Sequence, residues 1–275
     1  MADPGSCTPS ATAPRQRPFR QADRAALIAQ LCDPRVADWL AAIRQPFDTA
    51  EADTFLAFAA DPAQRVRALD VDGTLIGGMR LGDTLWYWLA PDHWGRGYMT
   101  RALREALAER FSAPAPPVVA TCREDNAASR ALLGRLGFSA RPVPRRMFFH
   151  GAGTSRACRD HLLTPEQWHL LNPPRLTAPG LVLRPARQAD LATVQGLMEG
   201  APPGGPWPGR DEERLRAFLE IHRFRGSGTA LWLVEDEARR ARGVALAGDG
   251  AARMRFAHLQ DEERLRAAVQ RLLGA

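Results

Sequence analysis

Hydrophobic and polar positions in the first part of the chain switch between the period of a helix and that of a strand. Apolar residues recur at three- and four-residue spacing in four stretches, which predicts helices over 22–32, 50–60, 100–111 and 127–135. Shorter runs rich in β-branched and aromatic residues predict strands over 65–71, 75–81, 84–90, 118–122, 145–150 and 156–163. Asp72-Gly73 separates two of these strands and indicates a hairpin turn. This order predicts an α/β fold built on a mixed sheet.

The beginning of this pattern is repeated in the second half of the chain. Residues 184–190 (Arg-Pro-Ala-Arg-Gln-Ala-Asp) agree with residues 17–23 (Arg-Pro-Phe-Arg-Gln-Ala-Asp) at six of seven positions, and each segment precedes an apolar-periodic helix. Less closely, residues 215–218 resemble 55–58, and residues 230–249 resemble 66–83. Because internal repeats indicate a repeated architecture, we expect two tandem modules rather than a chance match. Their expected bounds are 15–170 and 175–275, after a short disordered tail over 1–14.

One loop of the first module carries two glycines at alternate positions. Residues 94–100 read Trp-Gly-Arg-Gly-Tyr-Met-Thr and lie between the strand that ends near 90 and the helix that begins near 100. Such glycines let the backbone turn tightly and approach a ligand closely. The first N–H groups of a helix lack intrahelical acceptors and carry partial positive charge, which favours an anion. The loop therefore predicts a phosphate site, with an ordinary strand-to-helix turn as the alternative.

A second polar element follows the strand over 118–122. Asn126-Ala127-Ala128-Ser129 begins the next predicted helix, and Gly137 ends it as a C-cap residue would. Capping alone would account for an asparagine at this boundary. However, the chain contains only two asparagines, Asn126 and Asn172, so we infer a role beyond capping.

Together these two elements resemble the GCN5-related N-acetyltransferase (GNAT) superfamily, and more closely the branch that contains the ribosomal-protein N-terminal acetyltransferases RimJ and RimL. Further agreement lies in 17–23, 87–91 (Tyr-Trp-Leu-Ala-Pro) and 163–168 (Leu-Thr-Pro-Glu-Gln-Trp). The resemblance spans roughly 15–170 and implies the acyl-CoA N-acyltransferase fold, whose fourth and fifth strands splay apart around the pantetheine arm of coenzyme A. It implies an acetyl-CoA-dependent N-acetyltransferase. The acceptor would be a primary amine, a protein N-terminus or a small amine, attacking directly in a ternary complex.

The resemblance also implies which residues bind acetyl-CoA. Backbone N–H groups of the loop would hold the pyrophosphate, and Arg96 would add charge. The backbone near Leu89 and Ala90 would bind the pantetheine and the acetyl carbonyl, Asn126 would hold the arm, and Ser129 would lie near the sulfur or the phosphates. The full implied set is Leu89, Ala90, Trp94, Gly95, Arg96, Gly97, Tyr98, Met99, Thr100, Asn126 and Ser129. No metal is expected.

Two positions depart from the family pattern. Met99 stands where relatives have Gly or Ala, and Leu133 stands where many relatives carry a tyrosine that protonates the departing thiolate. The two tyrosines of the chain, Tyr87 and Tyr98, flank the glycine loop, and we expect both to serve aromatic packing. These departures support an alternative function, a catalytically weak acyl-CoA-binding or regulatory module.

The candidate catalytic residues are Ser129 and Glu124. Glu124 is the first choice for the general base because it immediately precedes the Asn126 turn at the end of the predicted fifth strand. The other candidates for the base are Asp83, His93 and Asp92. For each of these four side chains, the alternative is a solvated surface charge or a helix cap.

The second module is expected to be incomplete. Residues 253–258 run almost directly into the helical pattern over 261–273, without a glycine loop, and no later segment matches Asn126-x-x-Ser129. We therefore expect this module not to bind coenzyme A as the first does. The loop over 200–209, rich in Pro and Gly, is either a flap over a pocket or a surface connection.

Composition narrows the remaining classes. The net charge is +6 and all 37 basic residues are arginine, but they are spread along the chain, so nucleic-acid binding is not favoured. A positive protein would attract an anionic cofactor such as coenzyme A. No apolar run approaches the length of about 20 residues that crosses a bilayer, so we expect no membrane partner. The four cysteines lack disulfide or metal spacing, which predicts a cytoplasmic protein. We expect a monomer or a homodimer.

Overall fold

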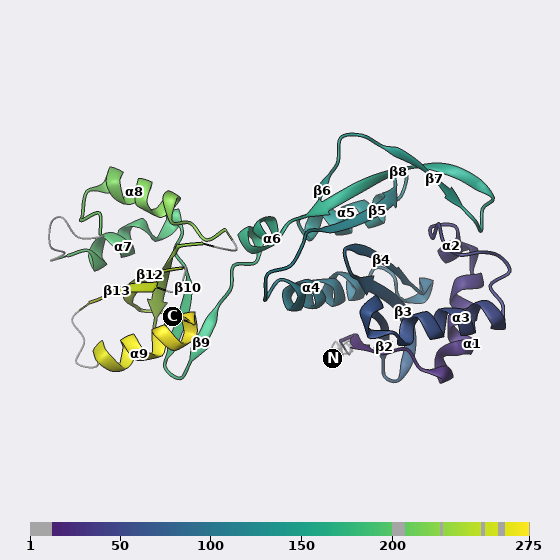
Figure 1. The fold of residues 1–275 in the computed structure, drawn as a ribbon, viewed down its shortest axis with the longest axis horizontal. Coiled ribbons are helices and arrows are strands. Elements are labelled where there is room, and N and C mark those ends of the chain that lie inside the picture. Colours follow the sequence, from purple (N-terminus) through teal and green to yellow (C-terminus); the bar gives the residue numbers. More distant parts are fainter. Residues whose placement is uncertain (1–12, 200–206, 226–227, 249–250, 258–261, 275) are drawn as a thin grey trace, which may run out of the picture. The chain divides into compact units, whose positions relative to one another are not determined.

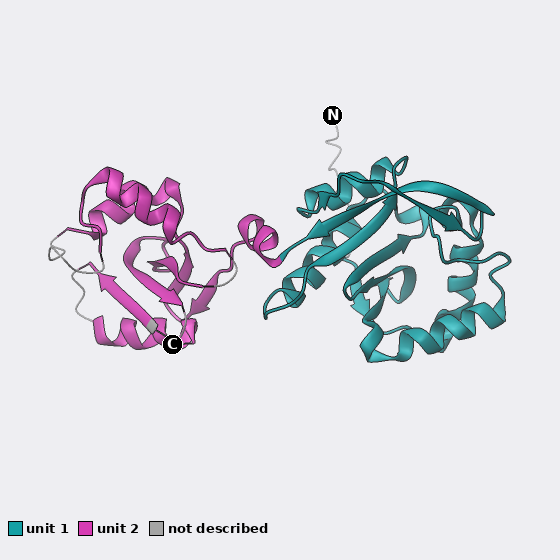
Figure 2. Ribbon diagram, turned by 45° about the horizontal axis from the view of Figure 1, so that its top comes forward, with its two compact units in different colours: residues 1–164 teal, residues 165–275 magenta. Residues whose placement is uncertain are grey.

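A computed structural model of the chain describes residues 13–199, 207–225, 228–248, 251–257 and 262–274. The chain divides into two compact units, residues 1–164 and residues 165–275 (Figure 2). Most of the expected disordered tail and most of the loop over 200–209 lie outside the described residues.

Unit 1 is built on an eight-stranded sheet in the order β1-β2-β3-β4-β5-β8-β6, with β7 also paired to β8 (Figure 1). Its strands are β1 (Arg15–Arg17), β2 (Val66–Val71), β3 (Thr74–Leu81), β4 (Thr84–Leu89), β5 (Val118–Arg123), β6 (Ser139–Ala140), β7 (Arg145–Phe149) and β8 (Thr154–Leu163). Its α-helices are α1 (Arg24–Cys32), α2 (Pro34–Ala37), α3 (Thr49–Ala60), α4 (Tyr98–Arg110) and α5 (Ala127–Arg135). Because β4 and β5 pair in parallel and the other pairs are antiparallel, the predicted α/β fold with a mixed sheet is confirmed.

The parallel pair of β4 and β5 is short. Only Thr84 with Val119 and Leu85 with Ala120 are in register across it. Further along, β4 continues to pair with β3 on its other side, and β5 continues to pair with β8. The two strands therefore separate toward their C-terminal ends, which leaves an opening in the middle of the sheet.

Alternation of side chains along β4 gives its two faces different roles. The Trp88 ring lies 6.0 Å from Phe19 and 5.8 Å from Phe55, on the face that α1 and α3 cover. A Cβ added at Gly78 of β3 would meet the Trp88 indole at 2.3 Å, so this position requires glycine. Tyr87 alternates with Trp88 and faces the opposite side of the sheet, toward α5.

Unit 2 has a five-stranded antiparallel sheet in the order β13-β12-β11-β10-β9. Its strands are β9 (Leu176–Ala178), β10 (Leu181–Pro185), β11 (Ala230–Glu235), β12 (Ala241–Gly248) and β13 (Ala251–Phe256). Its α-helices are α6 (Pro165–Leu171), α7 (Leu191–Leu197), α8 (Glu212–Ile221) and α9 (Glu262–Leu273). Two apolar clusters, one under α7 and α8 and one under α9, form its core.

A buried ion-pair triad joins the first strand of unit 1 to the next. Arg17 donates to both carboxylate oxygens of Asp23 at 2.7 and 2.8 Å, and its Nε donates to Asp70 at 2.9 Å. Asp23 lies in the turn between β1 and α1, and Asp70 follows a β-bulge in β2. The triad therefore fixes the strand, the turn and the neighbouring strand together.

Unit 2 contains the same triad at the repeated residues. Arg184 donates to Asp190 at 2.8 and 2.7 Å and to Glu235 at 2.9 Å. Glu235 also follows a register shift, between Val234 and Glu235 of β11. The similarity between 17–23 and 184–190 thus extends to hydrogen bonds and to the position of a bulge.

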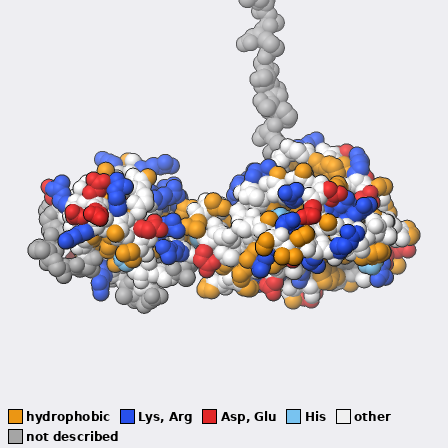
Figure 3. Space-filling view, turned by 90° about the horizontal axis from the view of Figure 1, so that it is seen from above, with side chains coloured by type: hydrophobic (Ala, Val, Ile, Leu, Met, Phe, Trp, Pro, Cys, Tyr) orange, Lys and Arg blue, Asp and Glu red, His pale blue; other side chains and the backbone are white. Residues whose placement is uncertain are grey.

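The division between the units falls six residues before the end of the expected first module, at Thr164 rather than near residue 170. The physical reason is the packing of α6, whose His169 ring lies 5.4 Å from Phe224 of unit 2. None of the described helices is long and apolar enough to cross a membrane. On the face in Figure 3, arginine side chains are interspersed with acidic and apolar ones.

Candidate active site

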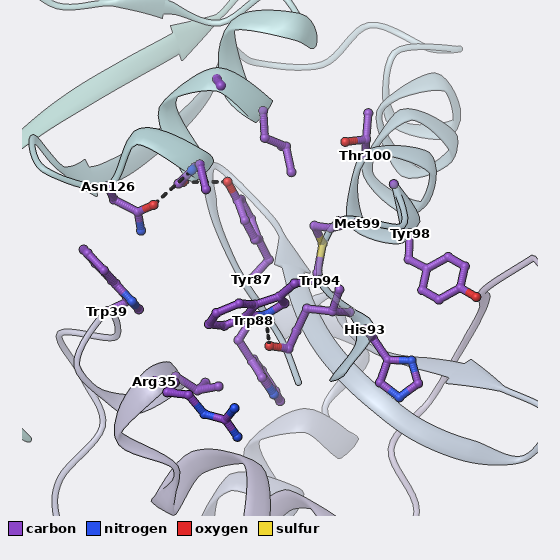
Figure 4. A pocket seen from close by; sticks show the side chains of 18 of the residues that line it. Arg35, Trp39, Tyr87, Trp88, His93, Trp94, Tyr98, Met99, Thr100 and Asn126 are labelled. Carbon is purple, nitrogen blue, oxygen red and sulfur yellow. Dashed lines mark hydrogen bonds between the residues drawn. The ribbon is translucent and has the colours of Figure 1, made fainter. Parts of the chain in front are cut away.

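One cavity of unit 1 lies at the C-terminal end of β4. It has a volume of about 630 Å³, in the range of small-molecule sites. The glycine loop, the first turn of α4 and one side of α5 form most of its wall (Figure 4). Of the eleven residues expected to bind the cofactor, nine line it, and only Ala90 and Arg96 do not.

The glycine loop has the backbone that an anion site needs. Gly95 and Gly97 have φ of +74° and +75°, in the left-handed region that favours glycine. A Cβ added at either position would meet nothing within 4 Å, so the space beside both residues is open. Gly97 is the N-cap of α4, and no described side chain accepts a hydrogen bond from the first turn. Its first N–H groups therefore face this space without an intrahelical acceptor.

The large side chains of this loop, Trp94, Tyr98 and Met99, point in different directions (Figure 4). The Tyr98 ring points away from Met99 and Trp94 in Figure 4, and its centroid lies 6.2 Å from that of the His93 ring. Met99, which stands where relatives have Gly or Ala, is 5% exposed and lines the cavity. The Trp94 indole donates from Nε1 to the Leu89 carbonyl at 2.7 Å, and 47% of the side chain is exposed.

Backbone groups at the end of β4 are mostly satisfied within the chain. The Ala90 N–H donates to the carbonyl of Ile76, and the Ala90 carbonyl accepts from the N–H of His93. With the hydrogen bond from Trp94 to the Leu89 carbonyl, these bonds occupy three of the backbone groups that were expected to bind the pantetheine. The exposed indole is the partner that a bound ligand would displace at lowest cost, because its ring is half in solvent.

Asn126 both caps α5 and lines the cavity. Its Oδ1 accepts a hydrogen bond from the Ser129 N–H at 3.0 Å, the capping interaction that the sequence left as an alternative. The side-chain amide N–H groups remain available on a residue that lines both cavities. Asn126 therefore orients Ser129 and still offers a donor to a ligand.

A second cavity, of about 680 Å³, meets the first where β4 and β5 separate. It is enclosed by the loop after α2, the middle of β4 and β5, α3, and β7. Six residues line both cavities: Trp39, Leu40, Tyr87, Trp88, Asn126 and Ser129. Two molecules, one bound in each cavity, would therefore meet at these residues.

Tyr87 contributes a hydroxyl to this junction. Its oxygen lies 2.7 Å from Oγ of Ser129, in a hydrogen bond that crosses from β4 to α5. Burial raises the pKa of Tyr87 to about 12, against the opposite effect of the Ser129 bond, so the phenol stays protonated at neutral pH. Tyr87, which was expected to serve aromatic packing, thus also makes a hydrogen bond at the junction, whereas the Tyr98 ring lies beside that of His93.

Beyond Ser129, the polar contacts continue to the thiol of Cys122 and the imidazole of His161. Burial raises the pKa of Cys122, and the hydrogen bond with Ser129 partly offsets the rise. Cys122 Sγ lies 3.9 Å from Nδ1 of His161, which is 4% exposed. Tyr87, Ser129, Cys122 and His161 thus form a chain of polar groups along one side of the opening.

The predicted catalytic pair is not brought together. Ser129 lies at the junction, but the Glu124 carboxylate accepts two hydrogen bonds from Arg159, at 3.1 and 2.5 Å, and lines neither cavity. Asp83 is largely exposed beside Arg110, whereas His93 lines the first cavity. The His93 Nδ1 is buried without a hydrogen-bond partner among the described residues.

Residues that the sequence did not indicate complete the walls. Arg35 and Trp39, in and after the short helix α2, line the first cavity, and Arg123 lies 4.2 Å over the Trp39 ring. Nothing in the local pattern of residues 34–43 indicates a ligand, because their role depends on contacts with β4 and β5. The one available signal was Trp39 itself, a large aromatic outside a periodic segment.

A search of the curated proteins gave no match. Among solved structures, the chain is similar to a GNAT-family acetyltransferase from Bacillus anthracis, with 17% identity, 57% of this chain and 97% of that chain covered, and a TM-score of 0.48.

Two further structures are similar to the same extent. A spermidine N-acetyltransferase from Vibrio cholerae, in complex with CoA and spermine, is 16% identical, covers 56% of this chain and 97% of its own, and has a TM-score of 0.48. An acetyltransferase from Salmonella typhimurium that modifies the N-terminal serine of ribosomal protein L7/L12 is 16% identical, with 55% and 95% covered and a TM-score of 0.46. The family model described as an acetyltransferase (GNAT) domain matches residues 16–139, all of which lie in unit 1.

Proposed function

We propose that the chain is an acetyl-CoA-dependent N-acetyltransferase that acetylates a primary amine, a protein N-terminus or a small amine, by direct attack in a ternary complex. The junction of the two cavities carries this proposal. The first cavity, with its open glycine loop and free helix N–H groups, suits a pyrophosphate-bearing thioester. The second offers a separate space that reaches the same residues, so donor and acceptor are held together without a covalent enzyme intermediate.

Positioning supplies much of the chemistry. N–H groups of Tyr98, Met99 and Thr100 bind the phosphates, and the amide of Asn126 binds the pantetheine arm. The neutral amine nitrogen attacks the thioester carbonyl carbon, the C–S bond breaks, the nitrogen loses one proton to solvent, and the thiolate receives one proton. Orienting two reactants in this way lowers a barrier by several kcal/mol, about 7–11 kcal/mol at most.

Tyr87 and Ser129 are the groups that we assign to the departing sulfur. The phenol, hydrogen-bonded to Ser129 at 2.7 Å, is a protonated donor at the junction. Leu133, at the family position of a tyrosine, is 1% exposed and lies one helical turn beyond Ser129. The Tyr87 hydroxyl, which comes from β4, thus lies near the turn of α5 on which relatives carry the proton-donating tyrosine. We propose no proton transfer through Glu124, which Arg159 holds outside both cavities.

Two measurements on the whole protein test the proposal. Acetyl-CoA binding is measured by calorimetry, and release of free thiol is followed with a panel of amines. Initial rates with both substrates varied should give intersecting double-reciprocal lines, as a ternary complex requires, and parallel lines would indicate a covalent intermediate instead. Absence of acetyl-CoA binding would overturn the proposal.

The alternative is a catalytically weak acyl-CoA-binding or regulatory module. The buried Leu133 and the engaged Glu124 favour it, because each removes an acid-base group expected near the thioester. Tight acetyl-CoA binding with no turnover of any amine would support this alternative and refute the enzymatic function.

We further propose that residues 175–275 are a truncated GNAT-like module without a cofactor site. The triad of Arg184, its bulge and the strand order support this assignment. The motifs at 17–23 and 87–91 support the RimJ/RimL-like branch for unit 1. Cytoplasmic location and a monomeric or homodimeric state stay predictions, and a fractionation experiment and light scattering would test them.

A further inference from the structure

Eight of the 28 residues that line the second cavity are aromatic. Phe55, Trp86 and Trp88 form a continuous cluster with ring centroids 5.8 to 6.2 Å apart. Two other aromatics of the lining are unusually exposed for their size, Trp39 at 38% and Phe58 at 40%. Such surface is stabilised when an apolar ligand covers it, which indicates a bulky and apolar occupant.

The charged residues of this cavity are mostly positive. Its lining contains three arginines, Arg44, Arg123 and Arg145, and one carboxylate, Glu51. The charge of Arg123 is neutralised by an ion pair with Asp125 at 2.5 Å. Arg145 donates to Asp160 at 3.1 Å but keeps 51% of its side chain exposed.

Arg44 is the free cation of the set. It is exposed, and no ion pair or hydrogen bond to its guanidinium occurs among the described residues. A guanidinium prefers a carboxylate or phosphate as a bidentate partner. The cavity therefore offers an anion one uncommitted arginine and one partly committed arginine.

From these observations we infer the class of the acceptor, an inference that rests on the proposed function. The acceptor is a primary amine carried on an aromatic or bulky apolar body that also bears an anionic group, as in an aromatic amino acid. A polyamine is disfavoured because its several ammonium groups would meet the uncommitted Arg44 and the partly committed Arg145, with Glu51 as the single carboxylate of the lining. The same arginines favour the neutral form of the amino group, which is the nucleophilic form.

Four amines separate the two parts of this inference. Phenylalanine has the ring and the carboxylate, phenethylamine has the ring alone, alanine has the carboxylate alone, and spermidine has neither. We expect the highest kcat/KM for phenylalanine, with phenethylamine and alanine each lower by roughly tenfold or more. A higher kcat/KM for spermidine than for phenylalanine overturns the inference and leaves the proposed function standing.

Two exposed side chains give variants that should fold. Arg44→Ala should raise KM roughly tenfold for phenylalanine and leave phenethylamine unchanged, because only the former has a carboxylate. Phe58→Ala should raise KM for both ring-bearing amines. The control is Arg104→Ala, at an exposed arginine of α4 that lines neither cavity. Equal effects of Arg44→Ala on both ring-bearing amines would overturn the anionic part of the inference.

A binding measurement tests the inference even without turnover. Trp39, Trp86 and Trp88 line the cavity, so an occupant should change tryptophan fluorescence. If acetyl-CoA binds but no amine is acetylated, the proposed function fails. The acceptor class then stands only if phenylalanine changes the fluorescence at lower concentration than spermidine does, and it is overturned if the order is reversed or neither binds.

Discussion

Replacing Arg17 by Met tests how the first unit is held together. The guanidinium donates three hydrogen bonds of 2.7 to 2.9 Å to Asp23 and Asp70, and the three side chains are 12%, 8% and 9% exposed. Arg17→Met keeps most of the side-chain volume but leaves two buried carboxylates without a countercharge. Breaking a buried pair from one side costs about 3–5 kcal/mol, a large part of the 5–15 kcal/mol typical of a domain.

The assay is urea unfolding of the full chain followed by tryptophan fluorescence. The matched control is Arg24→Met, because Arg24 pairs with Asp53 at 2.6 Å in the same unit, but with side chains 37% and 44% exposed. An exposed pair is worth about 0–1 kcal/mol, so the control should lose little. A loss for Arg17→Met no larger than that of the control would refute the reasoning that the triad is a buried structural centre.

The pH dependence of the free energy of unfolding independently tests the contribution of Asp23 to stability. Burial acts to raise the pKa of Asp23, but hydrogen bonds from Arg17 and from the Arg20 N–H outweigh it, so the pKa lies below its usual value of 3.8. A lowered carboxyl pKa stabilises the fold above the unfolded pKa, and this contribution is lost as the pH falls through the folded pKa. Arg17→Met lacks this contribution at every pH. The difference in unfolding free energy between wild type and variant should therefore narrow below about pH 4.

Three further substitutions test the other parts of the structure. Tyr87→Phe should lower kcat roughly 10²-fold with little change in the Kd of acetyl-CoA, because it removes a proton donor and no phosphate contact; stopped-flow and calorimetry measure the two. Gly97→Val should raise the Kd of acetyl-CoA about tenfold or more, since a branched residue disfavours φ of +75° and fills the open space, as calorimetry would show. Arg184→Met should destabilise unit 2 by about 3 kcal/mol in urea without changing that Kd.

Much of the fold followed from periodicity alone. The hairpin at Asp72-Gly73 and the strands on either side were predicted within one residue, because each has a clear apolar pattern and a turn signal. The helix after the glycine loop begins at Tyr98, two residues earlier than predicted. The strand β6 (Ser139–Ala140) was missed, since two exposed residues carry no pattern and pair only because β8 lies beside them.

The cofactor side of the candidate site was predictable for a similar reason. A glycine loop at a helix start is a local signal, and its backbone conformation follows from the glycines themselves. The junction depends on partners distant in sequence, because Tyr87 bonds to Ser129, 42 residues away, and Glu124 bonds to Arg159, 35 residues away. No local pattern indicates either bond, so sequence reasoning anticipated neither the contact of Glu124 with Arg159 nor that of Tyr87 with Ser129.

The two triads account for the likeness between unit 2 and the first part of unit 1. Each triad fixes a first strand, a turn and the next strand, which is the half of the fold that precedes the glycine loop. The opening of unit 1 requires β5, a parallel neighbour that departs from β4 after two residue pairs. In the described part of unit 2, β13 lies at the edge of an antiparallel sheet, and no strand pairs with its outer side. Without a diverging neighbour there is no gap in the sheet for a thioester, so acetyl-CoA affinity should depend on the loop of unit 1 alone.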